Sequence, residues 1–230
     1  MKQDIFLRAS DGHELAAYHV TPISQQIGQL VVLHEFFGLN NHIRNVANRF
    51  AALGYEVIVP GLFDRVQRGA DFDYDSVGIE AGRAMRAAVN VEDSLRDMKA
   101  GVDFISPRGK VGAIGYCWGG TLAFLAATRL ADQVACSVGY YGSQIVDFLD
   151  EEIGAPLLLN FGDNDLSIPL RDVVRIRERY PQLPIHVYPG KHGFNCDLRA
   201  NYTPDSAQAA LSRTLAFFGK HLHGENTKVA

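Results

Sequence analysis

One segment of the chain constrains its fold more than any other. Residues 111–114 form an apolar, β-branched run typical of a buried strand, and residues 119–128 have the composition of a helix. Between them, the spacing Gly115-x-Cys117-x-Gly119 predicts a nucleophile elbow, a tight strand-to-helix turn that projects one side chain out of the sheet. Glycines flank such a residue because its backbone is strained and a neighbouring Cβ would collide with the next strand or helix.

Cys117 has two interpretations at this point. Free cysteine is among the most buried residue types, so it can simply fill a strand–helix junction. Its predicted place at a helix N-terminus instead favours the thiolate, which is the nucleophilic form of the side chain.

The remaining elements alternate between strands and helices. The pattern predicts helices from the N-cap Asn40 to Gly54, over 80–105 with a break near Asn90, over 169–180, and from Thr203-Pro204 to 222. A long polar excursion covers 62–79. Strands are predicted over 4–10 and 13–20, joined by a two-residue hairpin at Asp11-Gly12, and over 29–34, 55–59, 134–140, 155–161 and 185–188. Buried strands alternating with helices indicate one α/β domain over 1–230, with a mostly parallel doubly wound sheet and a polar tail from about residue 223.

Composition excludes several classes of function. The formal net charge is −4 and the longest basic runs are short, so we expect no nucleic-acid partner and no membrane binding. The three cysteines are too widely spaced for a zinc site or a disulfide framework, so we expect a reducing cytoplasmic location and neither metal nor organic cofactor. No signal peptide or membrane span is expected, and the protein is predicted to be a monomer or small homo-oligomer.

Two later strands are followed by the partners that a nucleophile needs. Asp165 lies in the loop after residues 155–161, and His192 lies in the loop after residues 185–188. Nucleophile, acid and histidine in this order, each after a buried strand, predict a catalytic triad at the carboxyl edge of the sheet. Asp163 is the rival acid, and we prefer Asp165 because of its spacing to Ile168-Pro169. Each partner alone is also typical of an ordinary turn or surface loop.

With these motifs in place, the sequence resembles the dienelactone hydrolase family of α/β-hydrolases, which use cysteine in place of serine. The resemblance extends from Leu30 to Leu222. It rests on five segments, which are residues 34–40 (HEFFGLN), 115–120 (GYCWGG) and 139–142 (GYYG), and the loops that carry Asp165 and His192.

The resemblance implies roles for residues that spacing alone does not single out. Glu35 would activate the thiol of Cys117, where the alternative is a solvated carboxylate at a strand end. The amides of Phe36 and Trp118 would form the oxyanion hole. Phe37, Trp118 and Tyr140 would line the substrate pocket, unless they belong to the core.

The family also uses arginines to hold a substrate carboxylate. One lies in the excursion after the second buried strand, where the sequence does not rank the candidates Arg65, Arg83 and Arg86. Of these, Arg83 and Arg86 are taken as the expected substrate-binding residues. Another follows the histidine by four positions, and here that place holds Cys196. Carboxylated lactones are therefore expected to be poor substrates, unless a nearby arginine such as Arg199 restores the contact.

Together these features predict a cysteine-dependent hydrolase of a small carboxylic ester or lactone that works through an acyl-enzyme. Two alternatives remain open at this stage. One is an esterase or thioesterase for uncharged substrates, and the other is a catalytically silent hydrolase fold that serves as a binding protein.

Overall fold

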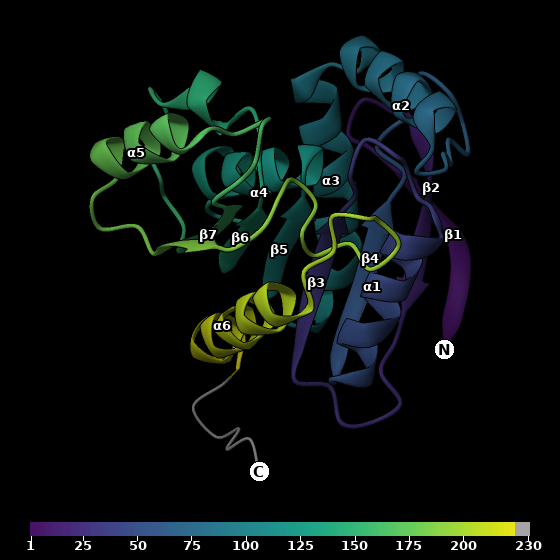
Figure 1. Ribbon diagram of the computed structural model, residues 1–230. Coiled ribbons are helices and arrows are strands. Elements are labelled where there is room, and N and C mark those ends of the chain that lie inside the picture. Colours follow the sequence, from purple (N-terminus) through teal and green to yellow (C-terminus); the bar gives the residue numbers. More distant parts are fainter. Residues whose placement is uncertain (224–230) are drawn as a thin grey trace.

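The sheet confirms the predicted mostly parallel architecture. The computed structural model describes residues 1–223, and its eight strands are ordered β1-β2-β4-β3-β5-β6-β7-β8 (Figure 1). β1 and β2 pair antiparallel, β2 is antiparallel to β4, and every other pairing is parallel. The strands are Lys2–Arg8 (β1), Glu14–Val20 (β2), Gly28–Leu33 (β3), Tyr55–Pro60 (β4), Val111–Tyr116 (β5), Cys136–Tyr140 (β6), Leu157–Gly162 (β7) and Ile185–Tyr188 (β8).

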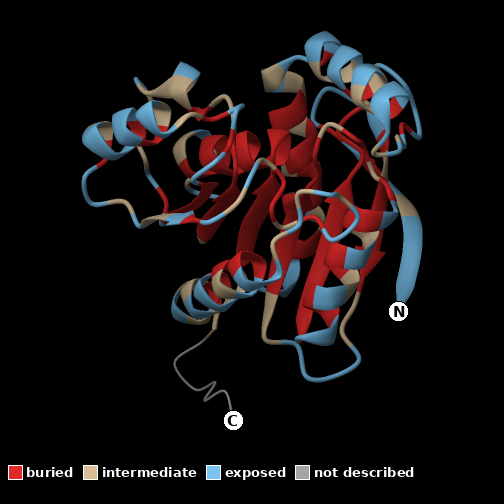
Figure 2. Ribbon diagram, viewed as in Figure 1, coloured by how far each residue is buried: buried red, intermediate tan, exposed pale blue. Residues whose placement is uncertain are grey.

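Helices cover both faces of the sheet, as the doubly wound prediction requires. α1 (Asn41–Ala52) and α6 (Pro204–Leu222) lie on one face, whereas α3 (Val91–Ile105) and α4 (Trp118–Arg129) pack on the other (Figure 1). α2 (Ser76–Ala88) and α5 (Leu170–Arg179) lie farther out, and short 3-10 helices cover Ser106–Arg108 and Ile145–Phe148. The central strands are buried on both faces, in keeping with their largely apolar sequences (Figure 2).

Side-chain caps explain where three helices begin. Asn40 caps α1 by accepting a hydrogen bond from the Ile43 amide at 3.1 Å. The expected break near Asn90 is confirmed, because Asn90 caps α3 and separates it from α2. α2 begins at Ser76, earlier than the expected Glu80, because Asp75 accepts a hydrogen bond from the Gly78 amide at 2.8 Å.

The prediction of a two-residue hairpin at Asp11-Gly12 is wrong. β1 ends at Arg8 and β2 begins at Glu14, so residues 9–13 form a longer loop. The loop closes through hydrogen bonds from the Ala9 amide to the His13 carbonyl and from the Gly12 amide to the Ala9 carbonyl. The predicted polar tail, apart from His223, lies outside the described residues.

Candidate active site

The strand-to-helix turn has the strained geometry expected of an elbow. Cys117 lies between β5 and α4 with φ 54° and ψ −114°, a backbone conformation that few L-residues adopt. A Cβ at Gly115 would lie 1.8 Å from the Gly119 carbonyl oxygen, and one at Gly119 would lie 2.1 Å from that of Leu33. Only glycine therefore permits the chain to turn this sharply against β3.

The structure brings Cys117, His192 and Asp165 into one hydrogen-bonded chain. Nε2 of His192 lies 3.2 Å from Sγ of Cys117, and Nδ1 lies 2.8 Å from Oδ2 of Asp165. The three residues follow β5, β8 and β7, whose carboxyl ends meet at one edge of the sheet. Asp165 also accepts hydrogen bonds from the amides of Ser167 and Ile168 at 2.8 and 3.1 Å, which hold its carboxylate in place.

Charge around the imidazole favours its protonated form. Burial alone would lower the pKa of His192, but Cys117 and Asp165 outweigh it and raise the pKa to about 10. An imidazolium in this position stabilises a thiolate on Cys117 and is ready to donate a proton.

The rival carboxylate has a different position. Asp163 accepts a hydrogen bond from the Gly190 amide at 3.0 Å and so joins the two loops that follow β7 and β8. It does not contact the imidazole, which bonds to Asp165.

Two backbone amides near the elbow are free to bind an anion. In the described part of the chain, neither the Phe36 amide nor the Trp118 amide donates a hydrogen bond to another protein group. Trp118 is the first residue of α4, where backbone N–H groups lack intrahelical partners and the helix dipole favours negative charge.

His34 supports this arrangement, and the sequence did not suggest it. Its Nδ1 donates to the Glu35 carbonyl at 2.7 Å and its Nε2 accepts from the Leu62 amide at 3.0 Å, which defines a neutral tautomer. Burial lowers the pKa of His34 to about 4, so the ring stays neutral near pH 7. The His34 carbonyl accepts from the Gly119 amide at 3.1 Å and joins the end of β3 to the elbow.

Glu35 is buried beside the triad and is not a solvated carboxylate. Its residue is 3% exposed, and neither carboxylate oxygen has a hydrogen-bond partner among the described residues. Nη1 of Arg199 lies 3.8 Å from Oε1 of Glu35, close enough for an ion pair. The sulfur of Cys117 hydrogen-bonds to His192, and no such bond joins it to Glu35.

A cavity of about 290 Å³ opens in front of the sulfur. Two arginines, Arg83 and Arg199, lie in its wall, together with Lys191. Its other lining residues are Phe36, Ile79, Cys117, Ser143, Asn164, Leu166, Ser167, His192 and Asn201.

The other arginine candidates are engaged elsewhere. Arg65 pairs with Asp97 and Asp11 at 2.7 and 2.8 Å, outside the cavity wall. Arg86 stacks over the indole of Trp118, with its guanidinium carbon 3.4 Å from the ring centroid, and donates to Gln144. The proposed contact between Arg86 and substrate therefore has no support in the structure.

The structure also separates the two interpretations of Cys196 and Arg199. Cys196 is completely buried, whereas the Arg199 guanidinium faces Glu35 and the cavity. This arrangement favours the alternative in which Arg199 supplies the positive charge that position 196 lacks.

The three aromatic candidates are mostly part of the core. Tyr140 is buried, and its hydroxyl shares a 2.7 Å hydrogen bond with Thr214 of α6, so it does not face the sulfur. Phe37 and Trp118 are also buried and do not line the cavity. Tyr141, the next residue, approaches the histidine instead. Its ring meets His192 edge-on with centroids 5.1 Å apart.

Tyr141 was missed although the motif at 139–142 contains it. Its φ of 38° is one of two positive values among non-glycine residues of the described chain, and this backbone turn redirects the side chain at the end of β6. The sequence pattern does not distinguish Tyr140 from Tyr141, because both are tyrosines. They differ only in the backbone conformation that directs their side chains.

Neither a metal centre nor a membrane span is found within residues 1–223. In that range, no group of three or more His, Cys, Asp or Glu side chains is placed to hold a metal ion. None of the helices described there has the length and apolar character to cross a membrane.

Comparisons with known proteins identify the family. The chain is 30% identical over 233 residues to a Synechocystis protein provisionally named carboxymethylenebutenolidase, covering 91% of this chain and 93% of that relative. It is 29% identical over 228 residues to carboxymethylenebutenolidase of Pseudomonas putida, covering 94% and 96% of the two chains.

A solved structure agrees with these relatives. A Klebsiella pneumoniae protein provisionally described as a dienelactone hydrolase superposes with a TM-score of 0.82 at 25% identity, covering 96% of this chain and 98% of that one. The predicted α/β-hydrolase fold is thereby confirmed. Since the sequence model of the dienelactone hydrolase family matches residues 15–222, this chain belongs to the dienelactone hydrolase family.

Proposed function

We propose that this hydrolase of ester or lactone bonds works through a Cys117–His192–Asp165 triad and a covalent acyl-enzyme. The observation that carries the proposal is the continuous hydrogen-bonded chain from sulfur to imidazole to carboxylate at the mouth of a cavity. Acyl transfer by a cysteine requires three groups, which are a sulfur nucleophile at the elbow, a protonated histidine and a carboxylate held in a fixed position.

The proposed reaction begins with attack by the Cys117 thiolate on the carbonyl carbon of the substrate. The negative charge that develops on the carbonyl oxygen is stabilised by the free amides of Phe36 and Trp118. His192 then donates its proton to the leaving oxygen, which for a lactone remains part of the acyl group. In the second half, His192 removes a proton from water as the water oxygen attacks the thioester carbonyl. The Cys117 thiolate then leaves, which restores the thiolate–imidazolium pair.

Asp165 and Glu35 lie next to the reacting groups and have different roles. Asp165 fixes the imidazole orientation and stabilises its cation. In the described conformation His192, and not Glu35, is the group bonded to the thiol. Glu35 can receive the thiol proton only if the Cys117 side chain rotates towards it, and in the present conformation it holds Arg199 beside the cavity.

The substrate we propose carries a carboxylate near the scissile bond. Arg83, Lys191 and Arg199 place positive charge in the cavity wall, and among them Arg199 is fixed by Glu35. A substrate carboxylate would compete with Glu35 for the Arg199 guanidinium. Esterase or thioesterase activity on uncharged substrates is the second candidate, because the apolar Phe36, Ile79 and Leu166 line the same cavity.

The test compares wild type with Cys117→Ala on a carboxylated lactone and on a chromogenic neutral ester. We expect a pre-steady-state burst for wild type and no turnover above background for the variant, with an unchanged circular dichroism spectrum. Turnover by Cys117→Ala at the wild-type rate would refute the nucleophile. If Arg199→Gln lowers kcat/KM equally for both substrates, the proposed carboxylate contact is wrong while the triad stands.

We propose a reducing compartment, the cytoplasm, as the site of action. Cys117, Cys136 and Cys196 are all free thiols, and the proposed mechanism depends on one of them remaining reduced.

A further inference from the structure

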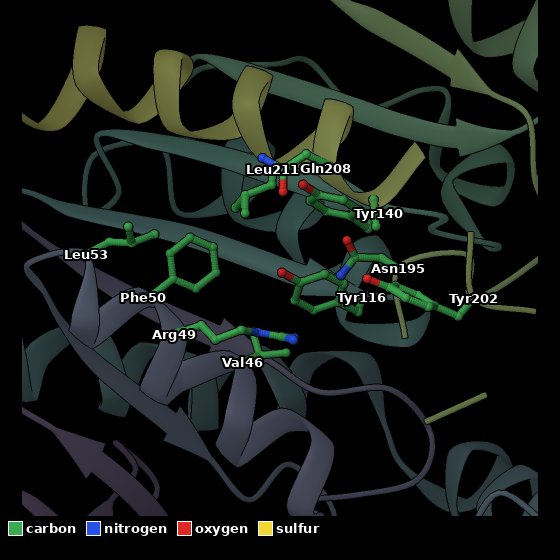
Figure 3. A pocket seen from close by; sticks show the side chains of 11 residues that line it. Val46, Arg49, Phe50, Leu53, Tyr116, Tyr140, Asn195, Tyr202, Gln208 and Leu211 are labelled. Carbon is green, nitrogen blue, oxygen red and sulfur yellow. The ribbon is translucent and has the colours of Figure 1, made fainter. Parts of the chain in front are cut away.

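A second cavity lies behind the elbow and has no part in the proposed reaction. Its volume is about 180 Å³, it is open to solvent on one side, and it is bordered by α1, α6, the ends of β5 and β6, and the loop that follows His192 (Figure 3). The walls are largely apolar. Its lining residues are Val46, Arg49, Phe50, Leu53, Tyr116, Tyr140, Asn195, Tyr202, Ala207, Gln208 and Leu211.

The volume of this cavity and the side chains in its walls indicate the kind of ligand that fits. An apolar cavity of about 150 Å³ accepts a benzene ring, so this slightly larger and partly open space has room for a single six-membered ring whose small substituent points towards the opening. Phe50 and the paired Tyr116 and Tyr140 rings, 4.9 Å apart, supply aromatic walls from α1 and from the sheet. Figure 3 shows the Tyr116 hydroxyl directed towards Phe50 across the space.

Tyr116 brings an unpartnered polar group into this apolar space. The residue is 3% exposed and lines the cavity, and its hydroxyl oxygen has no hydrogen-bond partner among the described residues but is not sealed from the open space. Burial raises the pKa of Tyr116 above that of a free phenol, so the hydroxyl remains a donor at neutral pH. Because this hydroxyl borders the cavity and no protein group accepts from it, a ligand oxygen bound there can accept its hydrogen bond.

The polar groups around the ring space select an anionic substituent. Arg49 contributes a half-exposed guanidinium, of which Nη1 donates to Asp197 at 2.7 Å while the other nitrogens carry no such bond to described residues. Asn195 and Gln208 add side-chain amides, and no aspartate or glutamate lines the cavity.

We propose that this cavity is a binding site for a small monocyclic aromatic carboxylate, separate from the cavity in front of Cys117. The ring lies between Phe50 and the Tyr116–Tyr140 pair, and the carboxylate accepts hydrogen bonds from Tyr116 and Arg49. The loop at 194–203 contributes to both cavities, with Asn195 and Tyr202 facing this site and Arg199 and Asn201 facing the other. A ligand bound here therefore contacts the loop that carries Arg199.

The test is a ligand-observed NMR titration of the full chain with benzoate, with benzyl alcohol as the neutral probe of similar size. We expect saturable benzoate binding that weakens about tenfold or more in Tyr116→Phe, which loses the donor, and in Leu211→Trp, which fills the space. Gln208→Leu, at an exposed helix position, should weaken binding about threefold and serves if the other two variants misfold.

Three outcomes overturn the proposal. No saturable binding to wild type would mean that the cavity holds only water. Equal affinity for benzyl alcohol would exclude the carboxylate contact. Loss of binding in Arg199→Gln, with Tyr116→Phe and Gln208→Leu unaffected, would place benzoate in the cavity of Cys117. These results do not depend on the proposed reaction, because binding is measured without turnover.

Discussion

Removal of Arg199 should destabilise the fold because it leaves the Glu35 charge buried alone. Their closest charged atoms are 3.8 Å apart, the Glu35 side chain is 3% exposed and that of Arg199 is 15% exposed. At an effective dielectric constant of about 20, this separation corresponds to about 4 kcal/mol of attraction. Because no hydrogen bond joins the two groups, we expect a coupling free energy of about 2 kcal/mol, about half of this attraction.

The assay is a double-mutant cycle with Glu35→Gln, Arg199→Gln and both together, measured by urea unfolding at pH 7.5. Arg199→Gln alone should cost about 3 kcal/mol of unfolding free energy, because breaking a buried pair from one side leaves an uncompensated charge. Glu35→Gln should cost less, since it removes a carboxylate that has no hydrogen bond. The double variant should then be about 2 kcal/mol more stable than the sum of the single effects predicts.

An exposed ion pair serves as the control that tests whether burial causes the strong coupling. Lys99 and Asp103 on α3 approach more closely, at 2.6 Å, but their side chains are 35% and 57% exposed. Their cycle should give a coupling of only about 0.3–0.5 kcal/mol. Coupling below about 0.5 kcal/mol between Glu35 and Arg199, or equal coupling in both cycles, would refute the reasoning.

Three further predictions concern the site and its supports. Asp165→Asn should lower kcat by about three to four orders of magnitude with the fold intact, and a loss below about tenfold in steady-state assays would remove Asp165 from the triad. Because the folded protein depresses the pKa of His34 to about 4, the stability it contributes is present above about pH 6.5 and is lost as pH falls towards 4. Between about pH 6.5 and pH 4, the unfolding free energy measured in urea should therefore fall by about 3 kcal/mol more for wild type than for His34→Gln. If both proteins lose stability equally over this range, His34 is not neutral in the folded state. Gly115→Ala should destabilise by more than about 4 kcal/mol, because its Cβ would lie 1.8 Å from a carbonyl oxygen, whereas Gly101→Ala, with 3.5 Å of clearance, should be neutral or slightly stabilising in thermal melts.

Local sequence predicted the elements and the edge at which the site lies. The caps at Asn40 and Asn90 act within three residues of themselves, so their effects are visible in the sequence. The elbow depends on Gly115 and Gly119, which are neighbours of Cys117 in the chain. Parallel strands all present their carboxyl ends at one edge, so the positions of Asp165 and His192 after their strands were enough to predict that they meet Cys117 there.

Tertiary structure alone decided which member of each set of similar residues belongs to the site. Asp165, and not its loop neighbour Asp163, bonds to the imidazole, and Tyr141, and not the adjacent Tyr140, packs against it. Of the candidate arginines, only Arg83 and Arg199 line the cavity. The hydrogen bonds and ion pairs that separate them join residues 27 to 164 positions apart, such as His192 with Asp165 and Arg199 with Glu35. The sequence determines local backbone preference and burial, whereas the direction of each side chain follows from how distant segments pack against one another.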